Sequence, residues 1–192
     1  MVKIRSEINL KVGADSSVPA KLYTFEGLSC DKEHIALRIL NTESEKLRLV
    51  RLHSECLTGD VFSSSRCDCG EQLNEAIARM SDIGGIILYL RQEGRGIGLY
   101  PKVDAYKLQD KGHDTFSANS ILGYSHDLRD YRVAAEMLKV LGAVHINLLT
   151  NNPEKVEKLI EFGVEVESVT NTRAYKKEDN MKYLKDLSLI HI

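Results

Sequence analysis

The sequence predicts a mixed α/β fold, in which a mostly antiparallel β portion is followed by alternating helices and strands. In the N-terminal portion, short runs with high β propensity alternate with polar turns, which is typical of antiparallel strands. Further along, the apolar residues take up helical spacing, and helix and strand patterns then alternate. The 192 residues are a suitable length for one domain. We expect a main domain over residues 1–170 and a charged tail over 171–192.

Three β-prone runs lie in the N-terminal portion, at residues 20–28, 34–40 and 47–53. The first predicted helix follows them. Its apolar residues recur at helical spacing, at Leu73, Ala76, Ile77 and Met80. A glycine pair ends this helix, and the apolar run GIILYL at 85–90 then predicts a buried strand.

The second half predicts a helix, a strand, a second helix and a second strand. The first helix is marked by Val133, Met137, Leu138 and Leu141. The strands are HINLLT at 145–150 and VEVESV at 164–169, with a loop and a helix between them over 151–163. This strand–helix–strand unit favours a sheet with crossover connections. The charged tail offers candidate apolar anchors, which are Tyr183, Leu184, Leu187 and Ile190.

Charge and hydropathy exclude several kinds of partner and location. The formal net charge is −2 and the sequence pI is about 6.3, so the chain has no global attraction for nucleic acid or a membrane surface. No apolar run reaches the length of a signal-peptide core or a membrane span. We therefore expect a cytoplasmic protein, and cytoplasmic cysteines are usually reduced. This expectation favours a metal site over a disulfide.

Three of the four cysteines fall within a short stretch, at Cys56, Cys67 and Cys69. Thiolates at this spacing suit Zn²⁺, which takes sulfur ligands at tetrahedral angles. Two readings stay open at this point. His53 could complete a closed structural site, or the fourth position could stay open for catalysis, with Glu55 accepting or relaying a proton.

A glycine-rich stretch, RQEGRGIGL at residues 91–99, directly follows the predicted strand 85–90. Its glycines permit a tight turn and close approach of the backbone to a ligand. Arg91 and Arg95 can bind a phosphate or a guanine edge with their planar guanidinium groups. The alternative is a solvated turn with a salt bridge.

Two further clusters stand next to predicted helices. Asp127 and Arg129 precede one helix, and the run LLTNNPEKV at 148–156 places Thr150 and Lys155 where a strand turns into a helix. Helix N-termini attract anions, so both places suit phosphate or a purine edge. Taken singly, each cluster is better explained by ordinary helix capping, by Asp127 or by Asn152.

Six motifs together resemble the GTP cyclohydrolase II family, which opens riboflavin biosynthesis. They stand in that family's order over about residues 48–165, as RLHSECLTGD, RCDCGEQL, RQEGRGIGL, AYKLQD, LRDY and LLTNNPEKV. The resemblance implies the family's fold, with a catalytic domain over 1–170. It also implies zinc-dependent hydrolysis of GTP, in which the guanine imidazole ring opens. Formate and pyrophosphate leave, and a diaminopyrimidinone ribosylamino phosphate remains.

The resemblance assigns roles position by position. The metal ligands would be Cys56, Cys67 and Cys69. GTP contacts would come from Arg51, Leu52, His53, Ser54, Glu55, Gln72, Glu93, Gly94, Arg95, Thr115, Thr150 and Lys155. Asp127 would be the proton acceptor, and Tyr106 would be needed for complete ring opening. Arg129 would be a nucleophile towards the α-phosphate, although a charge-stabilising role fits the sequence equally well.

The resemblance also implies partners and leaves rivals. Members of the family are homodimers and use Mg²⁺ on the triphosphate. The chain has no room in front for the synthase domain that some members carry, which predicts the stand-alone form. The family's closing pattern Tyr-Leu-x-Thr-Lys reads YLKDL at 183–187, so the role of the tail is open. One rival is a family variant that stops at the formamidopyrimidine. The other is a non-enzymatic zinc module that binds RNA or a protein.

Overall fold

The computed structural model describes residues 1–40, 49–125, 127–181 and 184, and it divides the chain into two compact units. The first, which we call the sheet unit, comprises Met1–His53, Leu73–Leu90 and Asp130–Thr172. The second, which we call the cysteine unit, comprises Ser54–Gln72, Arg91–Arg129 and Arg173–Ile192.

The sheet unit is built on seven strands. They are β1 (Lys3–Val12), β2 (Val18–Glu26), β3 (Ile35–Ile39), β4 (Leu49–Ser54), β5 (Gly85–Leu90), β6 (His145–Leu149) and β7 (Glu165–Thr170). Their order in the sheet is β1-β2-β3-β5-β4-β6-β7. The pairs β1–β2, β2–β3 and β3–β5 are antiparallel, whereas β4–β6 and β6–β7 are parallel. The antiparallel N-terminal portion and the parallel crossover unit that the sequence predicts are both present.

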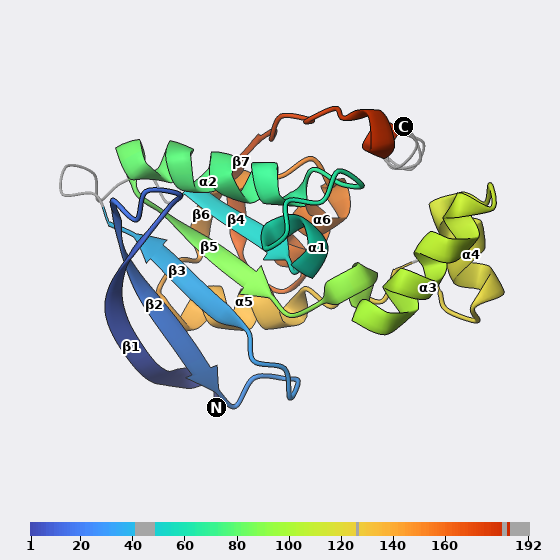
Figure 1. Cartoon of the computed structure of the whole chain (residues 1–192). Helices are drawn as coiled ribbons and strands as arrows, with labels where there is room; N and C mark the ends of the chain where they lie inside the picture. Colours follow the sequence, from blue (N-terminus) through green and yellow to red (C-terminus); the bar gives the residue numbers. More distant parts are fainter. Residues whose placement is uncertain (41–48, 126, 182–183, 185–192) are drawn as a thin grey trace. The chain divides into compact units, whose positions relative to one another are not determined.

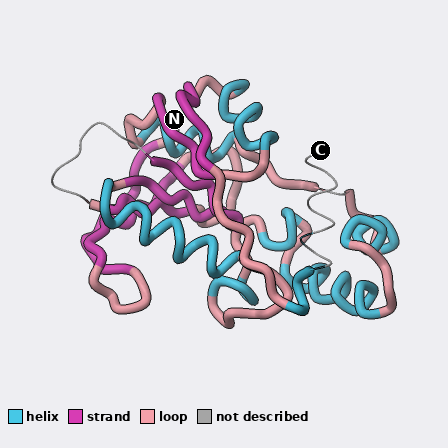
Figure 2. Tube along the Cα trace, turned by 90° about the horizontal axis from the view of Figure 1, so that it is seen from above, coloured by secondary structure: helices cyan, strands magenta, loops and turns pink. Residues whose placement is uncertain are grey.

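Helices cover both faces of this sheet (Figure 1). They are α2 (Cys69–Ile83), α5 (Arg132–Val140) and α6 (Pro153–Glu161). Ala76 and Met80 of α2 pack in one apolar cluster with Ile87 of β5. The adjacent Leu88 points to the opposite face, where it packs in a second cluster with Met137 of α5. Because side chains alternate along a strand, β5 contributes side chains to both apolar clusters. Figure 2 shows α2 crossing the strands.

The cysteine unit holds the other helices of the described residues. They are α1 (Leu57–Asp60), α3 (Leu99–Asp110), α4 (Thr115–Ile121), the first residues of α2, and two 3-10 turns at Glu93–Gly96 and Glu178–Asn180. The turn Glu93–Gly96 immediately follows the segment that leaves β5. It therefore lies where the sequence predicts a glycine-rich turn after a buried strand.

The predicted fold class is confirmed, and most predicted elements are found. The strand predicted over 47–53 corresponds to β4. The first two residues of the predicted range, 47 and 48, lie outside the described residues. The helix cap predicted at Asn152 is present, since its side-chain oxygen accepts from the Glu154 N–H at 2.9 Å. Asp127 does not cap α5, whose N-cap residue is Tyr131. Of the four candidate anchors in the tail, only Leu184 belongs to the described residues.

Candidate functional site

The three clustered cysteines converge on one buried point. Cys56 stands at the N-cap position of α1, Cys67 lies in the loop before α2, and Cys69 is the first residue of α2. The Sγ atoms of Cys56 and Cys67 are 3.5 Å apart, and all three sulfur atoms lie within 4.8 Å of one another. Among the residues that the structure describes, no His, Asp or Glu joins this group.

Two glycines leave room for the sulfur atoms. A β-carbon on Gly59 would stand 2.7 Å from Cys67 Sγ and 3.2 Å from Cys56 Sγ. A β-carbon on Gly70 would stand 2.4 Å from the backbone oxygen of Gly59. These distances are shorter than packing allows, so helix α1 can approach the cysteine loop this closely only because both positions lack a side chain.

The donor set fits a zinc ion. A tetrahedral ion at about 2.3 Å from each sulfur would separate the sulfurs by about 3.8 Å, which is compatible with the spacing of this group. Cys56 and Cys67 are 5% and 3% exposed, so a cation there would be shielded from water on the protein side. Soft sulfur donors also select Zn²⁺ over Mg²⁺ or Ca²⁺.

The three thiols share their protons unevenly. Hydrogen bonds from Cys67 and Cys69, with the Lys102 ammonium, hold the pKa of Cys56 well below its ordinary value, although burial opposes this. The hydrogen bond with Cys56 helps to raise the pKa of Cys67 to about 11, and the pKa of Cys69 is also raised.

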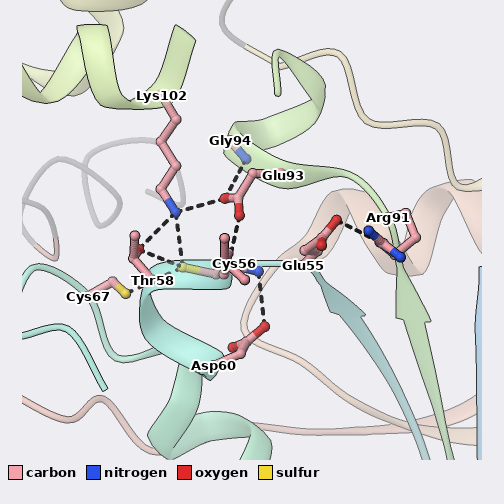
Figure 3. Close-up of polar contacts among 10 residues, drawn as sticks. Glu55, Cys56, Thr58, Asp60, Cys67, Arg91, Glu93, Gly94 and Lys102 are labelled. Carbon is pink, nitrogen blue, oxygen red and sulfur yellow. Dashed lines mark hydrogen bonds and ion pairs between the residues drawn. The ribbon is translucent and has the colours of Figure 1, made fainter. Parts of the chain in front are cut away.

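Lys102 and Glu93 connect the cluster to the glycine-rich turn (Figure 3). Lys102 Nζ donates to Cys56 Sγ at 3.1 Å, to Thr58 Oγ1 at 3.2 Å and to Glu93 Oε1 at 2.7 Å. The other carboxylate oxygen of Glu93 accepts from the Leu57 N–H at 2.6 Å. Burial would lower the pKa of Lys102, but the Cys56 thiolate, Tyr106 and Glu93 outweigh it and raise that pKa.

The glycine-rich turn has an unusual backbone. Gly94 and Arg95 adopt left-handed φ values of 62° and 60°, of which the second is uncommon for a residue with a side chain. Gly96 is required by packing, since a β-carbon there would stand 2.9 Å from the Leu128 backbone. The backbone oxygen of Arg95 accepts from the Leu128 N–H at 2.9 Å. These contacts fix the segment that carries Asp127 and Arg129 against the turn.

Asp127 and Arg129 form a two-point ion pair. Arg129 Nε donates to Asp127 Oδ1 at 2.8 Å, and its Nη2 donates to Asp127 Oδ2. Burial would raise the pKa of Asp127, but the hydrogen bonds and charge of Arg129, with a smaller contribution from Arg95, lower it. Asp127 is therefore an anion that is ion-paired with Arg129.

Tyr106 of α3 lies between two cations. The Arg66 guanidinium is 4.9 Å and the Lys102 ammonium 5.7 Å from its ring centroid. Burial raises the pKa of the Tyr106 hydroxyl, with the Lys102 charge opposing this. Lys102 Nζ lies 3.1 Å from Cys56 Sγ and 5.7 Å from the Tyr106 ring centroid, so the tyrosine lies near the sulfur cluster.

The loop before α2 is held by the segment 173–181, which we call the strap. Lys177 Nζ donates to the backbone oxygens of Ser64 and Cys67, each at 3.1 Å, and pairs with Glu71. The Tyr175 N–H donates to Asp68 Oδ2 at 3.2 Å. The strap therefore hydrogen-bonds to the loop before Cys67, at Ser64, and after it, at Asp68.

The remaining sequence-predicted residues fall into two groups. In the cysteine unit, Ser54 is the last residue of β4, and Thr115 begins α4. Glu55 accepts from Arg91 Nε at 3.0 Å, and Gln72 Nε2 donates to Asp68 at 2.9 Å. The sheet unit contains the other five, which are Arg51, Leu52, His53, Thr150 and Lys155.

The sheet-unit group is buried and hydrogen-bonded at the ends of β4 and β6. Lys155 Nζ donates to the backbone oxygen of Leu52 at 2.8 Å. Arg51 Nη1 donates to the backbone oxygen of Leu149 at 3.3 Å. Thr150 Oγ1 accepts from the Asn152 N–H at 3.1 Å, and the His53 ring stacks on Tyr89 with centroids 5.6 Å apart. These contacts bring Lys155 to β4, 103 residues upstream of it.

Sequence reasoning missed Lys102, Gly59 and Lys177. The sulfur that Lys102 contacts lies 46 residues upstream, so no local pattern signals the pair. Lys177 likewise contacts a residue 110 positions away. For Gly59 a signal existed, because a glycine inside a short helix between cysteines is unfavourable unless packing requires it.

No helix in the described ranges has the length and apolarity needed to cross a membrane.

The fold and the site define an α/β protein with a buried three-thiol centre next to a glycine-rich turn. A sequence profile of the GTP cyclohydrolase II family matches residues 6–171. The chain therefore belongs to the GTP cyclohydrolase II family, and it is an enzyme of that kind, which hydrolyses GTP in riboflavin biosynthesis. The resemblance drawn from the six motifs is confirmed.

Individual relatives agree with this assignment. The GTP cyclohydrolase-2 of Vibrio vulnificus (strain CMCP6) is 55% identical over 186 residues, which are 96% of this chain and 94% of that protein. That of Psychromonas ingrahamii is 56% identical over 186 residues, covering 96% and 93%. The riboflavin biosynthesis protein RibBA of Bacillus cereus is 53% identical over 154 residues, covering 80% of this chain and 39% of that protein.

Proposed function

We propose that the protein opens the guanine imidazole ring of GTP and releases formate and pyrophosphate, using one zinc ion held by Cys56, Cys67 and Cys69. The buried three-thiol cluster in a member of this family is the observation that carries the proposal. Zinc bound there would supply Lewis-acid and water-activating chemistry for attack on the ring carbon that leaves as formate. His53 is not a ligand in this proposal, since hydrolysis needs an open position.

Two side chains of the cysteine unit serve ring opening. Tyr106 has a raised pKa and stays protonated at neutral pH, so it can donate a proton or hydrogen bond to the opening ring. Glu55 adjoins Cys56 in sequence and carries a carboxylate that can accept a proton. Its ion pair with Arg91 holds that carboxylate in one orientation.

Asp127 and Arg129 serve the phosphate step together with Mg²⁺ on the triphosphate. Arg129 acts at the α-phosphate, where its guanidinium supplies positive charge in a forked geometry. Asp127 is the proton acceptor. Because Arg129 lowers the pKa of Asp127 and so weakens it as a base, the ion pair must part before Asp127 takes a proton. Binding of the phosphate by Arg129 would part it.

The remaining assigned residues bind the nucleotide. They are Arg51, Leu52, His53, Ser54, Glu55, Gln72, Glu93, Gly94, Arg95, Thr115, Thr150 and Lys155. For Glu93 we assign the contact to the backbone of its turn. Its carboxylate already accepts from Leu57, Gly94 and Lys102.

The assembly and location that we propose follow the family. The protein would act as a cytoplasmic homodimer, with GTP as its ligand and without nucleic acid or membrane partners. The net charge of −2 supports the absence of a nucleic-acid partner, since such proteins usually carry a basic patch.

The deciding experiment incubates the zinc-loaded protein with GTP and Mg²⁺ and follows formate and pyrophosphate separately. We expect both products. Pyrophosphate without formate would identify a variant that stops at the formamidopyrimidine, and neither product would favour a non-enzymatic zinc module. Tyr106→Phe should lose formate release and keep pyrophosphate release. Tyr100→Phe is the matched control, because Tyr100 lies on the same helix and is 82% exposed.

A further inference from the structure

We propose that Lys102 is a positioning residue of the metal centre, whose ammonium group orients Cys56 Sγ and offsets the negative charge of the three thiolates. This inference rests on the proposed function, since it requires a metal ion at the cysteines. It concerns a residue for which neither the motifs nor the assigned contacts to GTP provide a role.

The contacts of Lys102 satisfy its ammonium group completely. An ammonium group has three N–H donors, and here they meet one sulfur, one hydroxyl and one carboxylate, on Cys56, Thr58 and Glu93. Lys102 is 9% exposed, so these contacts replace water rather than supplement it. Burial of a lysine costs free energy unless its charge is paired and hydrogen-bonded. The ammonium group is therefore held by these three partners in one position.

The contact between Lys102 and Cys56 would compensate the charge of the metal centre. A divalent ion with three thiolates carries one net negative charge, and burial makes that charge costly. The ammonium group of Lys102 carries the opposite charge and lies 3.1 Å from one of the sulfurs. Donation of a hydrogen bond to a thiolate also withdraws electron density from it, so the metal becomes more electrophilic.

Glu93 fixes the lysine in place. Its carboxylate takes the Lys102 ammonium on one oxygen and the Leu57 N–H on the other. Leu57 directly follows Cys56, so one carboxylate holds both the lysine and the backbone next to the cysteine. An ion pair that only joined α3 to the turn would need neither the contact with sulfur nor the contact with Leu57.

The test compares Lys102→Met with the wild type and with Lys107→Met. Lys107 lies on the same helix, and its side chain is 71% exposed. Two quantities are measured on the full chain. One is the zinc dissociation constant, obtained by competition with a chelator. The other is the energy of the sulfur-to-metal charge-transfer band after Co²⁺ replaces zinc.

We expect Lys102→Met to weaken zinc binding by roughly 10- to 100-fold, as the loss of outer-shell partners does in other metal sites. The Co²⁺ band should move to lower energy, because a thiolate without its hydrogen bond gives up an electron more easily. Lys102→Arg should lie between Lys102→Met and the wild type in both quantities. Lys107→Met should match the wild type.

The results that would overturn the inference are distinct from those that would overturn the metal site. If the wild type binds one metal ion and Lys102→Met binds it equally well with an unchanged band, Lys102 only neutralises Glu93. If the wild type binds no stoichiometric metal, the proposed centre fails and this inference with it. Should Lys102→Met not fold, Lys102→Met with Glu93→Gln removes both charges, and the same band shift is expected.

Discussion

Gly59 lies directly against the sulfur of Cys67. A β-carbon at position 59 would stand 2.7 Å from Cys67 Sγ, 3.2 Å from Cys56 Sγ and 3.1 Å from the β-carbon of Cys69. All three cysteines therefore depend on a position that has no side chain. The smallest substitution possible at this residue tests whether the cysteines act as one metal centre.

We expect Gly59→Ala to weaken zinc binding by about 10-fold or more, because the added methyl group must push at least one sulfur away from the others. Zinc content after dialysis and the chelator-derived dissociation constant measure this. Gly123→Ala is the control, since Gly123 has a φ of +80° and no atom within 4 Å of its β-carbon position. That variant is strained without touching the site. Equal zinc retention in the two variants would contradict the packing argument.

The strap gives a second prediction. Lys177 holds the backbone oxygens of Ser64 and Cys67, and hydrogen bonds from a charged donor contribute about 1.5–3 kcal/mol. Lys177→Met should therefore release zinc faster and lower the free energy of unfolding by an amount of that order. Ring opening should fall in proportion to the zinc lost.

Lys176→Met is the matched control for the strap, because Lys176 is the adjacent residue and is exposed. Zinc release rates of both variants, measured with a chromogenic chelator, decide the point. If Lys176→Met and Lys177→Met release zinc equally fast, the strap does not hold the cysteine loop.

The sequence predicts the elements whose pattern is local and misses those fixed by distant contacts. Apolar spacing identifies α2, because Ala76 and Met80 face the sheet. It misses α3, whose apolar residues follow no single face and which contains Pro101 near its start. The N-terminal strand β1 is also missing from the prediction, although the alternating apolar residues Ile8, Leu10 and Val12 indicate a strand.

The same division holds for the site. The three cysteines are visible because two of them are separated by a single residue, and metal ligands often cluster in sequence. The residues around them are not visible. Lys102 and Lys177 reach the cluster across 46 and 110 positions, and their contacts depend on the tertiary fold. The pairing of Asp127 with Arg129 is intermediate, since the residues are close in sequence but only the backbone of the turn orients them.

The ion pair of Asp127 with Arg129 predicts a dependence of stability on pH. Arg129 lowers the pKa of Asp127 in the folded state, whereas an aspartate in the unfolded state has a pKa of about 3.9. The pair therefore stabilises the fold above that pH, and its contribution is lost as the pH falls towards the lowered pKa. The difference in unfolding free energy between wild type and Asp127→Asn should be largest near neutral pH and shrink below about pH 4.

Urea unfolding at several pH values measures this difference. Asp31→Asn makes the same change of charge at an exposed residue and corrects for the general effect of net charge. After that correction, a gap between wild type and Asp127→Asn that stays constant down to pH about 3 would contradict the lowered pKa.

Arg129 gives the last prediction, because a charge-stabilising role and a nucleophilic role require different states of its guanidinium. The two-point pair with Asp127 needs the protonated, planar group, and a protonated guanidinium is a poor nucleophile. We therefore expect charge stabilisation. Arg129→Lys keeps the charge and should retain part of the pyrophosphate release, whereas Arg129→Ala should lose about 100-fold or more. Lysine lacks the fork, so its activity should still fall below that of the wild type.

Mass spectrometry of the enzyme quenched during turnover distinguishes the two roles. A nucleophilic Arg129 would attack the α-phosphorus, expel pyrophosphate and leave a guanylyl group bonded to its side chain. An adduct of that mass mapped to Arg129, with both variants inactive, would overturn the electrostatic role. An active Arg129→Lys enzyme without an adduct would establish that the ion-paired guanidinium works by its charge, as expected from its two-point pair with Asp127.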